Sequence, residues 1–134
     1  MQRFVDAQER VYPQALAEIR AGKKLSHWMW FVFPQIAGLS RSSTAQFYAI
    51  ADRAEAEAYS RHALLGPRLV ECTEAMLGWA GKRRAERILG PIDALKFRSS
   101  LTLFEACAAD PIPFAAALDA FYVGERDTAT LDRL

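Results

Sequence analysis

The chain has 134 residues, of which 51% are hydrophobic and 25% are charged. A chain of this length forms one domain with a sizeable core, and this composition excludes intrinsic disorder. The formal net charge of +1 excludes the strong basic excess of a dedicated nucleic-acid-binding protein, and no apolar run is long enough to span a membrane.

The first predicted element is a helix that ends at a glycine. Tyr12, Leu16 and Ile19 are spaced as i, i+4 and i+7, which places them on one helix face. Pro13 fits the first turn of such a helix, where the missing N–H costs nothing, and Gly22 is a typical C-terminal cap.

The next segment, SHWMWFVFPQ (residues 26–35), is the most aromatic stretch of the chain. Its apolar run, Trp28 to Phe33, is consistent with a buried strand or a short buried helix, because periodicity cannot separate the two at this length. Ser26 is a suitable N-cap and Pro34 a suitable terminator, so we favour a short central helix. A helix that is apolar on all sides must be surrounded by other helices, so we expect this segment to be the hub of the core.

Helical patterns dominate the rest of the chain. The clearest helix repeats apolar residues at i, i+4, i+7, i+11 and i+14, namely Leu65, Leu69, Cys72, Met76 and Trp79. Further helices are expected over residues 45–50, 54–59, 93–108 and 111–121, and in a last turn capped by Asp127. Strict alternation, typical of strands, is scarce. We therefore predict an all-α fold, in which residues 1–134 form a single helical domain, a compact irregular bundle around the central aromatic-rich short helix.

Three groups of polar residues are candidates for a functional site. The first is His27, which begins the aromatic segment and shares a face with Trp30 if that segment is helical. A histidine beside aromatic rings can transfer protons, and an indole can stack on a planar ligand. The alternative is a structural histidine that closes the edge of the core.

The second group lies in the loop QIAGLSRSSTAQFY (residues 35–48), which is rich in hydroxyls and opens a predicted helix. Helix N-termini and nearby hydroxyls bind phosphate, and Arg41 adds a positive charge. The same serines are also ordinary N-caps, and neither GxxxxGK[ST] nor GxGxxG is present.

The third group is Asp93, Lys96 and Ser100, spaced as i, i+3 and i+7 on one predicted helix, with Ser99 beside them. An Asp–Lys pair at this spacing is usually a surface ion pair. Because neighbours such as Phe97 make the helix largely buried, the lysine on its remaining face is also a candidate to line a polar pocket.

Other patterns indicate less. Glu55, Tyr59 and His62 lie on one helical stripe, as a catalytic set or an exposed surface would. Cys72 and Cys107 fall within apolar helical patterns and are expected to be buried thiols. No cluster of cysteine and histidine has metal-ligand spacing, so we expect neither a metal nor a cofactor.

Several blocks resemble a known family. GKKLSHWMWFVFPQIAGLS, EAEAYSRHALLGPRLVE, LGPIDALKFRSSLTLF and LDAFYVGERDTATLDRL resemble the bacterial family catalogued as domain of unknown function 1810, over about residues 4–134. The resemblance implies a mostly helical, stand-alone cytoplasmic domain and carries over no activity. Members are often labelled calpastatin, but calpastatin inhibitory segments are disordered and rich in proline and charge, unlike this composition. Ser40 stands where the family pattern has glycine.

We therefore expect a cytoplasmic domain that binds or processes a small ligand, nucleotide-like or phosphorylated, with His27 as the catalytic residue. The alternative is a non-catalytic protein-interaction module, for which Phe121, Tyr122 and Val123 would offer an apolar patch. We expect no binding to a membrane or, through the basic run at 82–87, to nucleic acid, and homo-oligomerisation stays open. The expected ligand-binding residues are Trp30, Gln35, Ser40, Arg41, Ser43, Asp93, Lys96 and Ser100.

Overall fold

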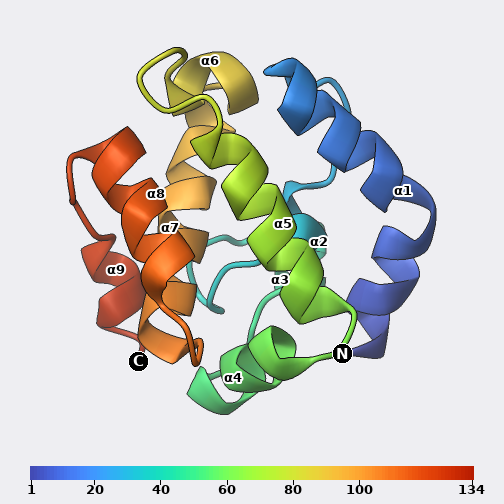
Figure 1. The fold of residues 1–134 in the computed structure, drawn as a ribbon. Coiled ribbons are helices and arrows are strands. Elements are labelled where there is room, and N and C mark those ends of the chain that lie inside the picture. The colour runs from blue at the N-terminus through green and yellow to red at the C-terminus, as the bar shows by residue number, and fades with distance from the viewer.

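A computed structural model describes residues 1–134 and contains nine helices and no strand, which confirms the predicted all-α fold (Figure 1). The helices are α1 (Gln2–Ala21), α2 (Met29–Val32), α3 (Ser43–Phe47), α4 (Arg53–Arg61), α5 (Leu65–Leu77), α6 (Ala85–Leu89), α7 (Pro91–Cys107), α8 (Ile112–Tyr122) and α9 (Thr128–Leu131). None of them is both long and apolar enough to cross a membrane.

The short helix α2 lies at the centre and packs against α1, α5 and α7. In Figure 1, α5 crosses in front of it, with α1 on one side and α7 and α8 on the other. Trp28, Met29, Val32 and Phe33 are at most 2% exposed, and the ring of Phe33 meets Phe97 of α7 edge to face, with centroids 4.7 Å apart. The aromatic segment is therefore the hub of the core, as its composition predicts.

The turn that leads into α2 is organised by Glu18 rather than by Ser26. We expected Ser26 to cap the helix, and this is wrong, because its hydroxyl donates to the Glu18 carboxylate over 2.6 Å and no side chain caps α2. The same carboxylate accepts from the backbone N–H of Leu25 and from the indole N–H of Trp28. Burial alone would raise the pKa of Glu18, but the hydrogen bonds from Ser26 and Trp28 outweigh it and lower the pKa to about 2.

Helix α1 begins ten residues earlier than the apolar repeat suggested. Pro13 was placed in its first turn, but it lies inside the helix. It leaves the carbonyl of Glu9 without its usual partner, and Glu9 is exposed, so water can take that place. The extra turns bring in Gln8, which is 1% exposed and donates to the carbonyl of Phe31. Gly22 ends the helix in the left-handed conformation, as predicted.

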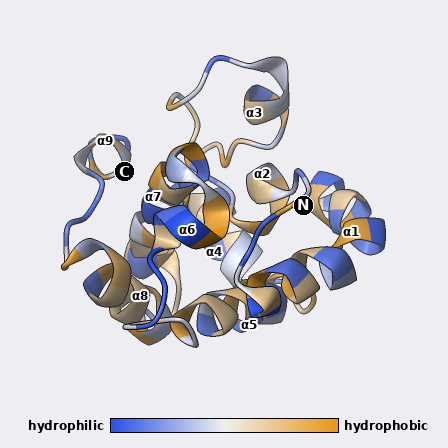
Figure 2. Cartoon of the chain, turned by 90° about the horizontal axis from the view of Figure 1, so that it is seen from above, coloured by the Kyte–Doolittle hydropathy of each residue, from blue (hydrophilic) through white to orange (hydrophobic).

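The short helix α3 is set apart from the others. It runs over Ser43–Phe47 rather than residues 45–50, and none of its residues is buried. Figure 2 shows it standing off the body of the protein on a wide loop, on the side where α9 also lies and away from α5 and α8. This loop and α9 frame the candidate site.

Candidate functional site

Two cavities border the loop before α3: the larger lies between this loop, α7 and α9, and the smaller lies between this loop, α2 and α3. The larger has a volume of about 350 Å³ and is lined by Gln35, Leu39, Ser40, Ile92, Leu95, Lys96, Ser99, Asp127 and Ala129. The smaller, about 130 Å³, is lined by Trp30, Gln35, Ile36, Ala37, Gly38, Leu39, Ser40, Ala45, Gln46, Tyr48 and Ala49. Gln35, Leu39 and Ser40 belong to both walls, so the two cavities are neighbours.

The loop wall is held from both ends. Ile50 N–H donates to the carbonyl of Gln35 and Ala37 N–H donates to the carbonyl of Ile50, both over 2.8 Å. Arg133, beyond α9, donates to the carbonyl of Gly38 over 3.1 Å. Gly38 has a φ of +97°, and a Cβ there would lie 2.6 Å from the Arg133 side chain. The loop thus needs its glycine at 38, whereas Ser40 has no positive φ and fits without strain.

The floor of the larger cavity is one face of α7. Ile92, Leu95, Lys96 and Ser99 lie at i, i+3, i+4 and i+7, which is the helical spacing of a single stripe. The Lys96 ammonium lies 4.7 Å from the centroid of the Trp30 ring, a cation–π distance. Lys96 thus lines the larger cavity while its ammonium lies over Trp30, which lines the smaller one.

A second lysine makes this region electropositive. Lys96 Nζ lies 3.6 Å from Asp93 Oδ1, and Lys24 Nζ lies 2.9 Å from Asp93 Oδ2. Two ammonium groups therefore share one carboxylate, which leaves one positive charge in excess. Lys24 is 8% exposed and stacks over Trp28, whereas Lys96 is 22% exposed and faces the cavity. Lys96 is consequently the cation that a ligand can reach.

The opposite end of the larger cavity is acidic. Asp127 precedes α9, and its Oδ2 accepts from the Ser99 hydroxyl over 2.9 Å and from the Thr130 hydroxyl over 2.5 Å. The guanidinium of Arg98 lies 3.8 Å from the other oxygen, Oδ1. The cavity thus has a cationic end and an acidic end, joined by apolar walls.

The structure brings together five of the residues predicted from the sequence. Gln35, Ser40 and Lys96 line the larger cavity, Trp30 lines the smaller one, and Asp93 holds Lys96. Neither the Gln35 amide nor the Ser40 hydroxyl has a hydrogen-bond partner in the chain, so both are available to a ligand.

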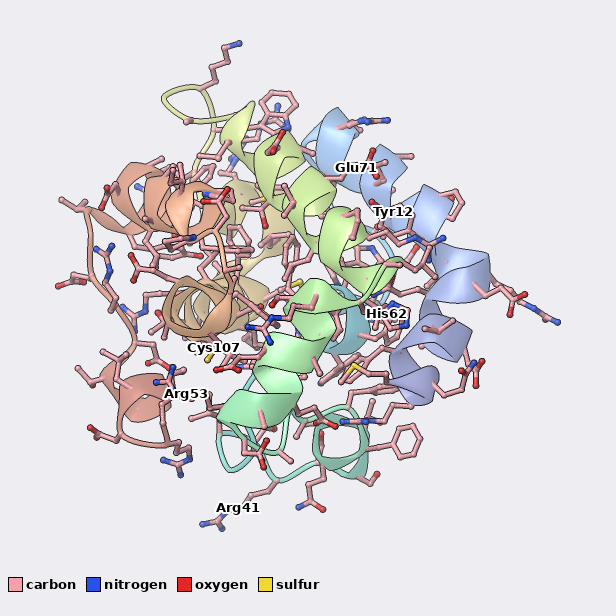
Figure 3. All side chains as sticks on the ribbon, turned by 60° about the horizontal axis from the view of Figure 1, so that its bottom comes forward. Tyr12, Arg41, Arg53, His62, Glu71 and Cys107 are labelled. Atoms are coloured by element: carbon pink, nitrogen blue, oxygen red, sulfur yellow. The ribbon has the colours of Figure 1, made fainter.

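The other four predicted residues lie outside both cavity walls. His27 is exposed and makes no side-chain hydrogen bond. Arg41 points away from the body of the protein (Figure 3), and Ser43 is exposed in α3, where Ser42 provides the cap. Ser100 is 1% exposed, and its hydroxyl has no partner.

Sequence reasoning did not assign Lys24, Leu39, Ser99 or Asp127 to the site. Ser99 stood beside the predicted helical stripe, and Asp127 was predicted only as a cap. Lys24 carried no signal, because its contact with Asp93 joins residues 69 positions apart. These side chains enter the site through tertiary packing.

The remaining candidates are occupied elsewhere. Glu55 pairs with Arg3 over 2.9 Å, Tyr59 is fully buried, and His62 Nδ1 accepts from the backbone N–H of Leu64 at the start of α5 (Figure 3). Both cysteines are buried free thiols, as expected. Burial raises the pKa of Cys107, and it raises that of Cys72 to about 12, so neither is poised as a nucleophile.

Comparison with known proteins identifies a family and a similar solved structure. The family model described as "Protein of unknown function (DUF1810)" matches residues 1–134. The crystal structure of a conserved hypothetical protein from Mycobacterium tuberculosis is similar, with a TM-score of 0.95 and 47% sequence identity, over 99% of this chain and 94% of that one. No curated protein matches the chain.

Proposed function

Because the chain belongs to the DUF1810 family, whose function is unknown, we propose a function from the site itself: the protein binds a small anionic ligand, phosphorylated or nucleotide-like, between α7 and the loop before α3. One observation carries this proposal. Lys96 is more than 50 positions from Gln35 and Ser40 in the sequence, and the three residues line one cavity with Trp30 beside it. Concave sites where polar groups converge beside apolar side chains are typical ligand sites.

The chemistry of these groups suits a ligand that has an anionic group and a flat or compact ring. The Lys96 ammonium has three donors and excess positive charge around it, and lysine is a common phosphate ligand. The Gln35 amide and the Ser40 hydroxyl add neutral donors. The Trp30 ring supplies a surface for stacking, and the Lys96 side chain already lies over it.

The proposal concerns binding and assigns no reaction. His27 was predicted to transfer protons, but it lies outside both cavity walls, so no described contact links it to a bound ligand. We place the function in the cytoplasm, because both cysteines are free thiols, as is usual in a reducing compartment.

A thermal-shift screen tests the proposal. Wild type and Lys96→Met are heated with inorganic phosphate, AMP, ADP-ribose, sugar phosphates and dicarboxylic acids. A ligand at about 100 times its Kd stabilises the folded state by about 2.7 kcal/mol, which raises Tm by several degrees at this size. The shift should disappear in Lys96→Met. Lys23→Met is the matched control, because Lys23 is exposed and lines neither cavity. If wild type shows no shift with any anion, the proposal fails.

A second candidate function has its own supporting observation. Ile92 and Leu95, on the rim of the same cavity, are 70% and 60% exposed, which suits a protein-interaction surface. The patch predicted at residues 121–123 is less extended, because only Val123 is fully open there, at 92%. Replacing Ile92 and Leu95 with serine should abolish partner binding under this alternative. Under the ligand-binding proposal, the same change should weaken the Lys96-dependent thermal shift without abolishing it, because both side chains also line the cavity.

A further inference from the structure

The larger cavity also contains a carboxylate, that of Asp127, which a bound anion would not contact. Asp127 Oδ2 accepts two hydroxyl hydrogen bonds, from Ser99 and Thr130. Oδ1 accepts none, because its nearest cation, Arg98 Nη2, is 3.8 Å away and beyond hydrogen-bond distance. The Asp127 side chain is 15% exposed and lines the cavity. A carboxylate oxygen with free acceptor capacity at a cavity wall favours a ligand that brings donors.

The charges around Asp127 indicate which donors fit. Arg98 lies 3.8 Å from this carboxylate and equally far from that of Glu125, so it offsets part of the charge of Asp127 and reduces the attraction for a ligand ammonium. A ligand ammonium would also meet the excess positive charge at Lys96. Hydroxyl groups donate equally well to a carboxylate and carry no charge. The acidic end is therefore suited to neutral hydroxyl donors.

The two ends of the cavity are reached from neighbouring turns of α7. Lys96 and Ser99 lie on one face of α7, three residues apart, which separates their Cβ atoms by roughly 5–6 Å. The Ser99 hydroxyl is in direct contact with Asp127. Lys96, Ser99 and Asp127 all line this cavity of about 350 Å³, so a small ring bound in it would have its phosphate at Lys96 and its hydroxyls at Asp127, with Leu39 and Leu95 beside its carbon atoms.

We infer that the ligand is a sugar phosphate, bound with its phosphate at Lys96 and with ring hydroxyls donating to Asp127 Oδ1 beside the Ser99 hydroxyl. This inference rests on the proposed function, and it assigns the substrate class within that site. Asp127 and Ser99 are the residues that would distinguish sugar phosphates from other phosphorylated molecules. Carbohydrate hydroxyls supply this discrimination because the buried polar groups of a site are left unpaired when the hydroxyls are absent.

Calorimetric titration tests the inference on the full chain. The ligands are inorganic phosphate, ribose 5-phosphate, glucose 6-phosphate, and two analogues without ring hydroxyls, tetrahydrofurfuryl phosphate and tetrahydropyranylmethyl phosphate. At least one sugar phosphate should bind wild type about tenfold or more tightly than its hydroxyl-free analogue. In Asp127→Asn and in Ser99→Ala this advantage should shrink to about threefold or less, with the affinity for inorganic phosphate unchanged. Glu125→Gln is the matched control, because Glu125 also lies 3.8 Å from Arg98 but is outside the cavity wall.

The outcomes separate the inference from the proposed function. If phosphate binding depends on Lys96, but each sugar phosphate binds no better than its analogue, the inference is overturned and the proposed function stands. If Asp127→Asn weakens inorganic phosphate as strongly as the sugar phosphate, the inference is also overturned. If no phosphate compound binds wild type, both fail. Asp127 also holds α9 through Thr130, so the comparison of ligands on wild type and on Ser99→Ala decides the matter should Asp127→Asn not fold.

Discussion

Trp28 and Trp30 are two residues apart and have opposite roles. Each lies under a lysine ammonium, Lys24 at 5.2 Å from the ring of Trp28 and Lys96 at 4.7 Å from that of Trp30. Both lysines pair with the same carboxylate, Asp93. Trp28 is 0% exposed, whereas Trp30 is half-buried and lines a cavity. The same pairing of residue types therefore builds core on one side of Asp93 and a cavity wall on the other.

The difference comes from the polar atom of each ring. The Trp28 indole N–H donates to Glu18 over 2.9 Å, so this ring can be buried completely without an unsatisfied donor. The Trp30 indole N–H has no partner in the chain, and the ring is only half-buried. A tryptophan whose N–H is left free at a cavity is ready to contact a ligand. The comparison teaches that hydrogen-bond satisfaction, rather than residue type, separates core from site here.

The largest expected effect that tests this comparison is on the free energy of unfolding. Trp28→Ala should lower it by about 3–5 kcal/mol, because it leaves a large cavity in the core. Trp30→Ala should cost clearly less, since that ring already borders open space. Urea denaturation of both variants measures the difference. Equal losses would mean that Trp30 is as much a part of the core as Trp28.

A smaller effect is expected at Glu18, and it depends on pH. Glu18→Gln should cost about 2–3 kcal/mol at pH 7, because it removes charge-assisted hydrogen bonds from a nearly buried position. The folded pKa of Glu18, about 2, is below its unfolded value of roughly 4.3, so the carboxylate stabilises the fold fully above about pH 5. That stability is lost as the pH falls toward 2.

Urea denaturation of wild type and Glu18→Gln between pH 7 and pH 2 checks this expectation. The gap in unfolding free energy should close as the pH falls, because Glu18 becomes protonated in wild type. The other carboxylates titrate in both proteins, so their contributions cancel in the difference. A gap that stays constant down to pH 2 would contradict the role of the Glu18 charge.

Features set by local chain chemistry could be predicted from the sequence. Helix α5 was found because Leu65, Leu69, Cys72 and Met76 repeat with the helical period, and all four are at most 2% exposed. The aromatic hub was found because so many large apolar side chains can only be buried together. Lys96 could be predicted because a lysine on a largely buried helix must lie on the part of its surface that stays accessible.

What the sequence could not show depends on contacts between distant residues. Ser26 is a good N-cap by type, but Glu18, on the preceding helix, takes its hydroxyl. Asp127 caps a short helix by position, but its carboxylate meets Ser99, 28 residues earlier. The cavity exists only because α9 and the loop before α3 meet over α7, and no local pattern encodes that meeting.

The smallest expected effect compares the two lysines on Asp93. Lys24→Met should lower the free energy of unfolding by about 1–2 kcal/mol, because Lys24 is nearly buried and lies 2.9 Å from the carboxylate. Lys96→Met should change it by no more than about 0.5 kcal/mol, because that pair is longer, at 3.6 Å, and more exposed. Ligand binding should show the reverse order, since only Lys96 lines the cavity. Denaturation and calorimetry on the same two variants measure both quantities. If Lys96→Met proved the more destabilising of the two, Lys96 would be a structural residue and the division between core and site at Asp93 would be wrong.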